Sequence, residues 1–310
     1  MAQRATRING YLIEGDHVYV KNRTRPLCDV PIMRSGNKPV DGGNYLFTPD
    51  EKAEFIANEP KSQKFFRRWF GSQEFINSIE RWCLWLGECN PNRLRAMPHV
   101  IKRVQNVRGF RGKSKKAKTR EFASQPTRFE VETFADESYL LVPAVSSERR
   151  PFAPIGFMDA STIPSNLVNV ILDASLYHFG VLCSTMHMAW VRHVAGRLKS
   201  DYRYSANLVY NNYPWPPAVS DAKRAAVEKA AQGVLDARDA YPEASLADLY
   251  DPLAMPAKLA KAHAKLDRAV DRCYRSQPFP NERNRVEYLF KLYQKLTAPL
   301  LPTKKKGGKK

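Results

Sequence analysis

This 310-residue sequence lacks the features that mark secreted, zinc-bound and membrane proteins. Its five cysteines are scattered, odd in number and without a Cys-x-x-Cys pair, so neither a disulfide framework nor a zinc ribbon is indicated. The longest apolar stretch, residues 167–191, is interrupted by Asn169, Asp173, His178 and His187, and the N-terminus has no apolar signal segment. We therefore expect a cytoplasmic protein that does not bind membranes.

Sequence motifs for catalysis are also lacking. There is no Gly-x-Gly-x-x-Gly, Walker A, His-Glu-x-x-His or Gly-x-Ser-x-Gly. Asn90–Arg93 lacks the second proline and the aromatic residue of the Asn-Pro-Pro-aromatic motif that grips a flipped base. Asp50 and residues 59–61 mimic a metal-dependent nuclease pattern, but Asp50 lies at an expected helix start. Cys183 and His187 share a helix face, which without a third ligand favours a core position, so we expect no catalytic or metal site.

Acidic residues are too few to balance the basic ones. Lys and Arg number 50 against 31 Asp and Glu, which gives a net charge of +19 at pH 7. The run from Arg95 to Arg128 carries eleven Lys and Arg against the single acid Glu121, and is broken by Gly109 and Gly112. This density of positive charge favours an external polyanion, nucleic acid first. A flexible, solvated basic loop without a partner is the alternative explanation.

Material for a hydrophobic core is plentiful, since 43% of the residues are hydrophobic and 11% are aromatic. Residues 11–13 and 17–20 have the pattern of short strands. Residues 139–145 predict a buried strand, and residues 152–157 predict its partner. The aromatic-rich segment 64–86 has apolar neighbours that favour burial, with stacking on bases as the alternative.

Two helices are predicted in the first part of the chain. Thr48, followed by Pro49 and Glu51, has the pattern of a capping box before an amphipathic helix that runs to Ala57. Residues 165–181 are apolar nearly all round, which is typical of a helix buried in a core.

The next segment predicts a helix with one apolar and one basic face. From Ser184 to Lys199 the apolar residues recur at helical spacing. Arg192, Lys199 and Arg203 fall within about 20° of one line if the helix continues. Such a helix places its arginines against phosphates or guanine edges. A surface helix with ordinary exposed arginines is the alternative.

A proline-rich segment then marks a domain boundary. Tyr213–Pro217 contains three prolines in four positions, which excludes helix and central strand alike. Pro256 and Asn281 are start signals for the second and third of the helices that follow. The helical patterns predict a bundle over three segments: 227–235, 259–273 and 286–296.

Several longer phrases carry a family resemblance. They are KPVDGG at 38–43, EFI at 74–76 with RWCLWL at 81–86, PAVSSERR at 143–150, GRLKSDYRYS at 196–205, YNNYPWP at 210–216 and SLADLYDP at 245–252. The phrases resemble the C-terminal half of MmeI-like restriction-modification enzymes over nearly the whole chain. Members of that family combine an N-terminal nuclease, an adenine-N6 methyltransferase that uses S-adenosylmethionine, a target recognition domain and a C-terminal helical region. This chain resembles only the last two parts.

The resemblance implies a module that reads a sequence on double-stranded DNA in the major groove and positions an adenine for flipping into a methyltransferase pocket elsewhere. The family's catalytic motifs are not among these residues, so we expect no cofactor in this chain and S-adenosylmethionine in the complete enzyme. The chain would then be a truncated gene product or one half of a split enzyme, with a separate methyltransferase or nuclease chain as partner. Two alternatives remain. One is an active enzyme, either a methyltransferase or nuclease by itself or an adenine-N6 DNA methyltransferase only with a partner chain. The other is a nucleic-acid-binding protein without sequence choice.

Two groups of residues are candidate DNA contacts. In the basic run they are Arg108, Arg111, Lys113, Ser114, Lys115, Lys116, Lys118 and Arg120. On the second helix and its exit they are Arg192, Arg197, Lys199, Asp201 and Arg203. Asp201 is a candidate acceptor for the amino group of cytosine, and pairing with Arg197 or Arg203 is the structural alternative.

The expected fold class is α+β, a mixed strand and helix target recognition domain followed by a C-terminal helical bundle. Residues 1–98 are expected to form the N-terminal part of the recognition region, connecting it to an absent methyltransferase domain. We expect residues 99–217 to form its core, residues 218–302 the helical domain, and residues 303–310 a disordered Lys-rich tail.

Overall fold

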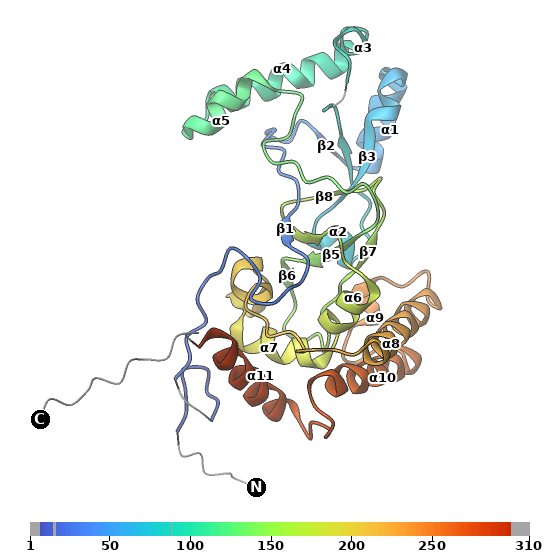
Figure 1. Cartoon of the computed structure of the whole chain (residues 1–310). Helices are drawn as coiled ribbons and strands as arrows, with labels where there is room; N and C mark the ends of the chain where they lie inside the picture. Colours follow the sequence, from blue (N-terminus) through green and yellow to red (C-terminus); the bar gives the residue numbers. More distant parts are fainter. Residues whose placement is uncertain (1–6, 15–16, 88, 299–310) are drawn as a thin grey trace, which may run out of the picture.

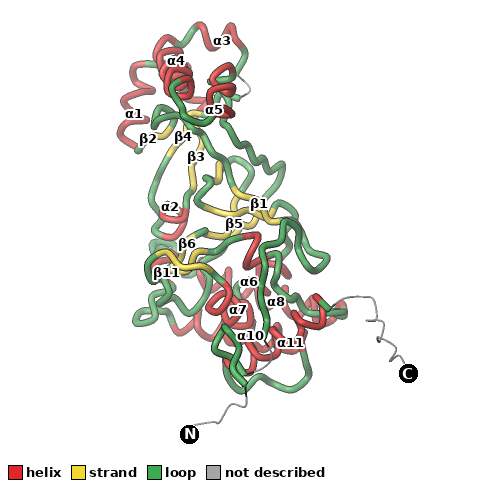
Figure 2. The backbone as a smooth tube through the Cα atoms, turned by 90° about the vertical axis from the view of Figure 1, so that its left-hand side faces the viewer, coloured by secondary structure: helices red, strands yellow, loops and turns green. Residues whose placement is uncertain are grey.

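The computed structural model of the chain describes residues 7–14, 17–87 and 89–298. The molecule is elongated in two perpendicular views, with a smaller lobe of strands and helices at one end and a larger body of packed helices at the other (Figure 1 and Figure 2). The mixed α+β fold with a C-terminal helical region is confirmed. The Lys-rich tail expected at 303–310 lies outside the described residues.

The smaller lobe is built on a mixed sheet with the strand order β2-β4-β3-β8. The strands are β2 (Leu46–Phe47), β3 (Phe66–Phe70), β4 (Trp82–Leu84) and β8 (Ile163–Pro164). β3 pairs antiparallel with β4 and parallel with β8. The surrounding helices are α1 (Pro49–Asn58), η1 (Pro60–Phe65), α3 (Pro91–Arg95), α4 (Pro98–Gly112), α5 (Ala117–Glu121) and η2 (Phe122–Ser124).

Local sequence signals place the first helix and the core of this lobe. The Thr48 hydroxyl accepts a hydrogen bond from the Glu51 amide at 3.3 Å, and the Glu51 carboxylate accepts one from the Thr48 amide at 2.7 Å, so the predicted capping box is confirmed. Phe66 and Trp69 are buried in the core of the lobe, as expected for the aromatic-rich segment. The strands expected at 11–13 and 17–20 are wrong, since among the described residues that region holds only an isolated bridge between Ile8 and Glu14.

An antiparallel sheet with the order β1-β9-β5-β7 connects the lobe to the body. Its strands are β1 (Met33–Ser35), β5 (Tyr139–Pro143), β7 (Gly156–Met158) and β9 (Val168–Ile171), and the short helix α2 (Ser72–Ile76) lies beside it. β5 and β7 pair antiparallel, which confirms the strand predicted at 139–145 and its partner, although the partner begins only at Gly156 instead of at residue 152. The single helix predicted over 165–181 is wrong, because 168–171 is a strand with partners on both sides. A buried strand and a buried helix both present continuous apolar residues, which periodicity cannot distinguish.

The body begins with α6 (Leu176–Leu182) and α7 (Thr185–Val194). α7 ends at Val194 instead of continuing to Lys199, because Ala195 is extended and the next residues pair as strands. β10 (Gly196–Leu198) and β11 (Asp201–Arg203) form a hairpin, and β11 pairs further with β6 (Val145–Ser146). The predicted alignment of Arg192, Lys199 and Arg203 on one helix is therefore wrong.

The C-terminal helices complete the body. After the π-helix η3 (Ala206–Tyr210) they are α8 (Asp221–Asp239), α9 (Leu246–Leu249), α10 (Ala257–Tyr274) and α11 (Glu282–Thr297). Pro256 and Asn281 are the N-cap residues of α10 and α11, as predicted. Among the described residues the bundle does not have a core of its own: its buried side chains form one cluster with those of α6 and α7, and Tyr213 and Trp215 of the proline-rich segment lie within it. None of the described helices combines the length and the apolar character that crossing a membrane requires.

Candidate nucleic-acid interface

The basic run folds into two helices at the outer end of the smaller lobe (Figure 1). The flexible loop, the alternative explanation of this run, is wrong: α4 contains Gly109 and Gly112, and four residues separate it from α5. The buried residues of α4 are Val100, Val104, Val107 and Arg111, spaced four, three and four apart. That spacing gives α4 one face against the core and leaves the opposite face to solvent.

A buried carboxylate starts α4. One oxygen of Glu59 accepts hydrogen bonds from the backbone amides of His99 at 2.7 Å and Val100 at 3.3 Å, both in the first turn of the helix. These are amides without intrahelical partners, and a negative charge is favourable at this end of a helix. Glu59 is therefore a structural cap, and Asp50 lies exposed in the first turn of α1. The resemblance of these residues to a nuclease motif has a structural explanation.

The side chain of Arg111, near the end of α4, is completely buried. Its guanidinium donates five hydrogen bonds at 2.7–3.3 Å to backbone carbonyl oxygens, those of Pro39, Val40, Phe122, Gln125 and Arg128. Burial lowers the pKa of this side chain from its usual value. All the donors of the guanidinium point into the protein, which leaves none for DNA. We therefore assign Arg111 a positioning role instead of the predicted direct contact.

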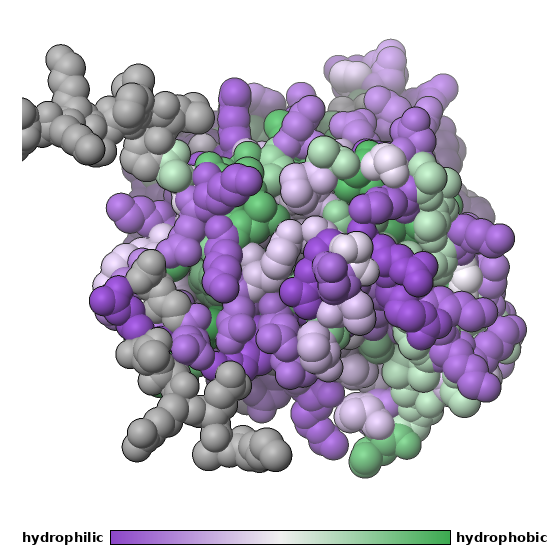
Figure 3. Space-filling model, turned by 60° about the horizontal axis from the view of Figure 1, so that its bottom comes forward, coloured by the Kyte–Doolittle hydropathy of each residue, from purple (hydrophilic) through white to green (hydrophobic). Residues whose placement is uncertain are grey.

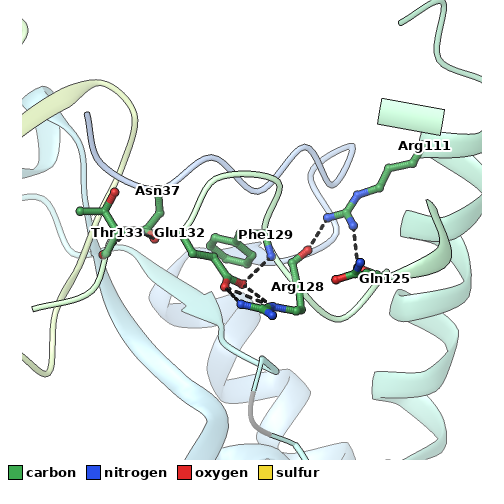
Figure 4. A network of polar contacts seen from close by, with 7 residues as sticks. All are labelled: Asn37, Arg111, Gln125, Arg128, Phe129, Glu132 and Thr133. Atoms are coloured by element: carbon green, nitrogen blue, oxygen red, sulfur yellow. Dashed lines mark hydrogen bonds and ion pairs between the residues drawn. The ribbon is translucent and has the colours of Figure 1, made fainter. Parts of the chain in front are cut away.

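The segment after α5 is fixed by a second set of contacts. Arg128 forms an ion pair with Glu132, whose carboxylate also accepts a hydrogen bond from the Phe129 amide at 3.0 Å (Figure 4). Further along, the Asn37 side chain accepts a hydrogen bond from the Thr133 amide at 2.8 Å. Glu59 at the start of α4, and Arg111 with these contacts at the other end, therefore attach both ends of the basic helices to the lobe.

The exposed cations from Arg108 to Arg120, on the last part of α4, on α5 and in the turn between them, form a surface that we call the basic ridge. Its members are Arg108, Lys113, Lys115, Lys116, Lys118 and Arg120. The first five make no hydrogen bond or ion pair through their side chains with any described residue, whereas Arg120 donates to the carbonyl oxygens of Ser114 at 2.8 Å and Lys115 at 2.9 Å. Ser114 is half-buried, and its hydroxyl accepts from the Lys116 amide at 3.2 Å. The ridge thus offers uncommitted positive charge on a fixed backbone.

The β10–β11 hairpin carries the second group of candidates. Leu198 pairs with Asp201, so Lys199 and Ser200 form the turn, and Lys199 has a φ of 55°. Successive side chains of a strand point to opposite faces. Arg197 and Tyr202 therefore share one face, with the guanidinium 4.1 Å from the ring centroid. Asp201 and Arg203 share the other face.

The contacts of the hairpin residues separate committed from uncommitted groups. Arg197 donates to Glu148 at 3.2 Å and to the Ser200 carbonyl oxygen at 2.8 Å. Lys199 and Arg203 are exposed, and neither their side chains nor that of Asp201 has a hydrogen bond or an ion pair within the described ranges. The pairing of Asp201 with Arg197 or Arg203, the structural alternative, is thus not formed.

Arg192 is not part of the hairpin, and its contacts give it a structural role. It is half-buried on α7, forms an ion pair with Glu282 at the start of α11 and donates to the Pro151 carbonyl oxygen at 3.3 Å. Arg192 therefore fastens two helices to each other. Sequence reasoning missed the exposed Arg149, which follows β6 beside the hairpin; its place in the polar run 146–150 was the available signal.

The remaining candidate motifs are structural. Asn90 is the N-cap of α3 and accepts from the Asn92 amide at 2.9 Å. His187 contacts the Tyr204 hydroxyl through Nε2 at 3.0 Å, and Cys183 is 3.6 Å from the Arg238 guanidinium. Within the described part of the chain, no three His, Cys, Asp or Glu side chains are arranged to hold a metal ion.

These features define an α+β protein with two basic surfaces, one on a helix pair and one on a β-hairpin. A family model described as the MmeI target recognition domain matches residues 14–217, and a model of the MmeI C-terminal domain matches residues 219–301. The chain therefore belongs to the family of MmeI target recognition domains, with the associated C-terminal domain. The resemblance seen in the sequence is confirmed.

Two characterised proteins show where this chain falls within longer ones. DNA methyltransferase A of Bacillus subtilis (strain 168) is 42% identical over 293 residues, which are 94% of this chain and 33% of that protein. A solved structure of the type IIL restriction-modification enzyme MmeI in complex with DNA matches with a TM-score of 0.92 and 48% identity. The match covers 96% of this chain and 40% of that one. The chain thus spans between a third and two fifths of the proteins that it resembles.

Proposed function

We propose that this chain reads a sequence on double-stranded DNA, with the β10–β11 hairpin in the major groove and the basic ridge on the phosphates. The major groove admits a two-stranded β-ribbon as well as a helix. The carrying observation is that Asp201 and Arg203 lie on one face of the hairpin without a partner among the described residues. On the other face, the guanidinium of Arg197 lies 4.1 Å from the ring centroid of Tyr202, so this arginine already has a partner within the protein.

The chemistry of that face suits base recognition. An arginine such as Arg203 donates two hydrogen bonds to O6 and N7 of guanine, and a carboxylate such as Asp201 accepts from the amino group of cytosine. Side chains that share one face of a strand can contact the edges of neighbouring base pairs. Lys199 at the turn adds a positive charge at the tip. The ridge, by contrast, presents flexible lysines, which hold phosphates without choosing a sequence.

The relatives support the same role. The MmeI structure contains DNA, and the Bacillus protein is named a DNA methyltransferase. In our proposal the methyl transfer, and the S-adenosylmethionine that it uses, belong to parts of the relatives that this chain does not span. Those parts would be supplied by a separate methyltransferase or nuclease chain, or by the rest of the complete enzyme. The proposal places the protein in the cytoplasm, where the DNA of a restriction-modification system lies.

A selection experiment tests the proposal. The purified chain is mixed with a pool of random duplexes, and the bound fraction is sequenced over several rounds. We expect a short enriched sequence, and we expect Arg203→Ala to lose enrichment at one base pair of it. If the chain binds the duplexes with high affinity but no sequence is enriched, it is instead a general nucleic-acid-binding protein. Transfer of a labelled methyl group to DNA by the homogeneous chain would show that the catalytic site lies within it.

A further inference from the structure

A groove runs along the surface of the body where α8 and α10 pack side by side. Its volume is about 810 Å³, and its floor is made of small residues, Ala222, Ala226, Ala230, Gly233 and Ala237 from α8 with Ala262 and Ala269 from α10. Figure 3, which looks at the body from below, shows on its right-hand side weakly apolar surface bordered by hydrophilic groups. The floor residues are spaced four, four, three and four apart along α8, so they form one stripe of the helix.

The walls of this groove carry charge of one sign. On α10 they are Lys258, Lys261, Lys265, Arg268 and Arg272, spaced three, four, three and four apart. On α8 they include Lys223 and Lys229, and no acidic residue lines the groove. None of these seven side chains makes a hydrogen bond or ion pair with another residue in the described part of the chain. Like charges three or four residues apart on a helix repel each other, so the row on α10 is unfavourable without an anionic partner.

The combination of an apolar floor and two cationic walls selects among partners. A helix with an apolar face and acidic flanks covers the alanines and pairs with both walls at once. A DNA backbone pairs with the cations but leaves the apolar floor uncovered. A second copy of this chain, with a net charge of +19, is repelled. The floor from Ala222 to Ala237 is about 22 Å long at 1.5 Å per residue, the length of about four helical turns.

We propose that the groove between α8 and α10 is a docking site for an acidic amphipathic helix of a partner protein. The groove shares no residue with the DNA contacts proposed above, because its lining comes from α8 and α10 alone. The basic ridge lies at the far end of the smaller lobe (Figure 1), and the hairpin is formed by residues 196–203. DNA and the partner helix can therefore be bound together.

A designed peptide tests the site directly. The probe is a fluorescein-labelled helical peptide of about 15 residues with leucine and alanine on one face and glutamate on both flanks. Its binding to the full chain is measured by anisotropy. We expect binding that weakens at least about tenfold in the double variant Lys261→Glu/Lys265→Glu and in Ala226→Glu, which places an acid on the floor. All three positions are solvent-facing on long helices, and circular dichroism checks that the variants fold.

Two controls make the result decisive. The double variant Lys115→Glu/Lys116→Glu on the basic ridge removes the same charge and should leave peptide binding within about twofold. A scrambled peptide of the same composition, without an apolar face, should bind at least about tenfold more weakly. Equal binding of the two peptides, or no binding of either, would overturn the proposal. So would a loss of duplex DNA binding in Lys261→Glu/Lys265→Glu with peptide binding unchanged, since the groove would then be a DNA surface.

Discussion

Arg111 donates a hydrogen bond from Nη2 to the carbonyl oxygen of Arg128 at 2.7 Å, joining the end of α4 to the segment that follows α5 (Figure 4). The same nitrogen donates to the Pro39 carbonyl oxygen at 2.8 Å. One buried cation thus holds three stretches of backbone that are distant in sequence. The orientation of the basic ridge depends on a residue that does not reach the surface.

The first prediction concerns this buried cation. Arg111→Met should lower the free energy of unfolding by about 3 kcal/mol, because five carbonyl oxygens lose their donor and a charged hydrogen-bond network is broken. Chemical denaturation measures the change. Arg108→Met, exposed on the same helix, should change the free energy of unfolding by no more than about 0.5 kcal/mol. Equal effects of the two substitutions would show that Arg111 does not organise the ridge.

The second prediction concerns the salt dependence of DNA binding. Each phosphate contact lowers log K by about 0.9 per unit of log salt, so replacing Lys113, Lys115 and Lys116 by alanine should reduce the slope by about two to three units. All DNA sequences should be weakened alike. The measurement is binding at three salt concentrations to a selected duplex and to a scrambled one.

A matched control keeps the net charge equal. Lys258→Ala, Lys261→Ala and Lys265→Ala together remove the same three charges from the groove on α10. We expect that triple variant to retain the wild-type slope. If the ridge variant retained it as well, the ridge would not be the phosphate-binding surface.

The third prediction separates selectivity from stability. Arg203→Ala should cost about 1–3 kcal/mol of binding on the preferred sequence and little on random DNA, because Arg203 is exposed and uncommitted. Arg192→Ala should instead lower the free energy of unfolding by about 1 kcal/mol, since it breaks the ion pair with Glu282. Binding and denaturation are measured for both variants. A selectivity change in Arg192→Ala without loss of stability would contradict this division.

The fourth prediction concerns the turn of the hairpin. Lys199 has a φ of 55°, where glycine is unstrained and a β-branched residue is strongly disfavoured. Lys199→Gly should therefore preserve the hairpin, while Lys199→Val should lower the free energy of unfolding by about 1–2 kcal/mol relative to it. Thermal unfolding of the two variants provides the comparison. Because both lack the lysine charge, any shared loss of DNA affinity reports the charge itself.

Signals that act within a few residues were readable from the sequence. The Thr48 and Glu51 pair fixes the start of α1, and Asn281 accepts a hydrogen bond from the Asn284 amide at 3.0 Å to start α11. Each depends only on neighbouring backbone, so sequence spacing is enough to predict it. The family phrases likewise identified the kind of protein.

Features that depend on distant partners were not readable in the same way. The apolar pattern around α7 suggested a longer helix, but β11 pairs with Ser146 and Val145, far back in the chain. Pairing of that kind overrides local helical preference. Arg111 looked like its exposed neighbours because its five acceptors are backbone oxygens, which leave no trace in side-chain composition.

The last prediction concerns acid. Burial lowers the pKa of His178 to about 4 and of His187 to about 3, and it lowers the pKa of His263 well below its usual value. Burial raises the pKa of Asp267 to about 6. Unfolding at about pH 5 therefore exposes three imidazoles that take up a proton and one carboxyl that releases one, because their unfolded pKa values are about 6.5 and 3.9.

The three histidines outweigh the aspartate, so the folded state should lose stability as pH falls from about 6.5 to 4, with a net uptake of about two protons on unfolding near pH 5. Asp267 acts in the opposite sense, since its folded form holds a proton in this window that the unfolded chain lacks. Denaturation at several pH values gives the proton number from the slope of the free energy. His178→Gln should reduce that number by about one, because it removes one of the imidazoles whose pKa burial lowers. A stability that rises on acidification through this range would mean that the aspartate dominates and that the histidines are protonated in the folded chain.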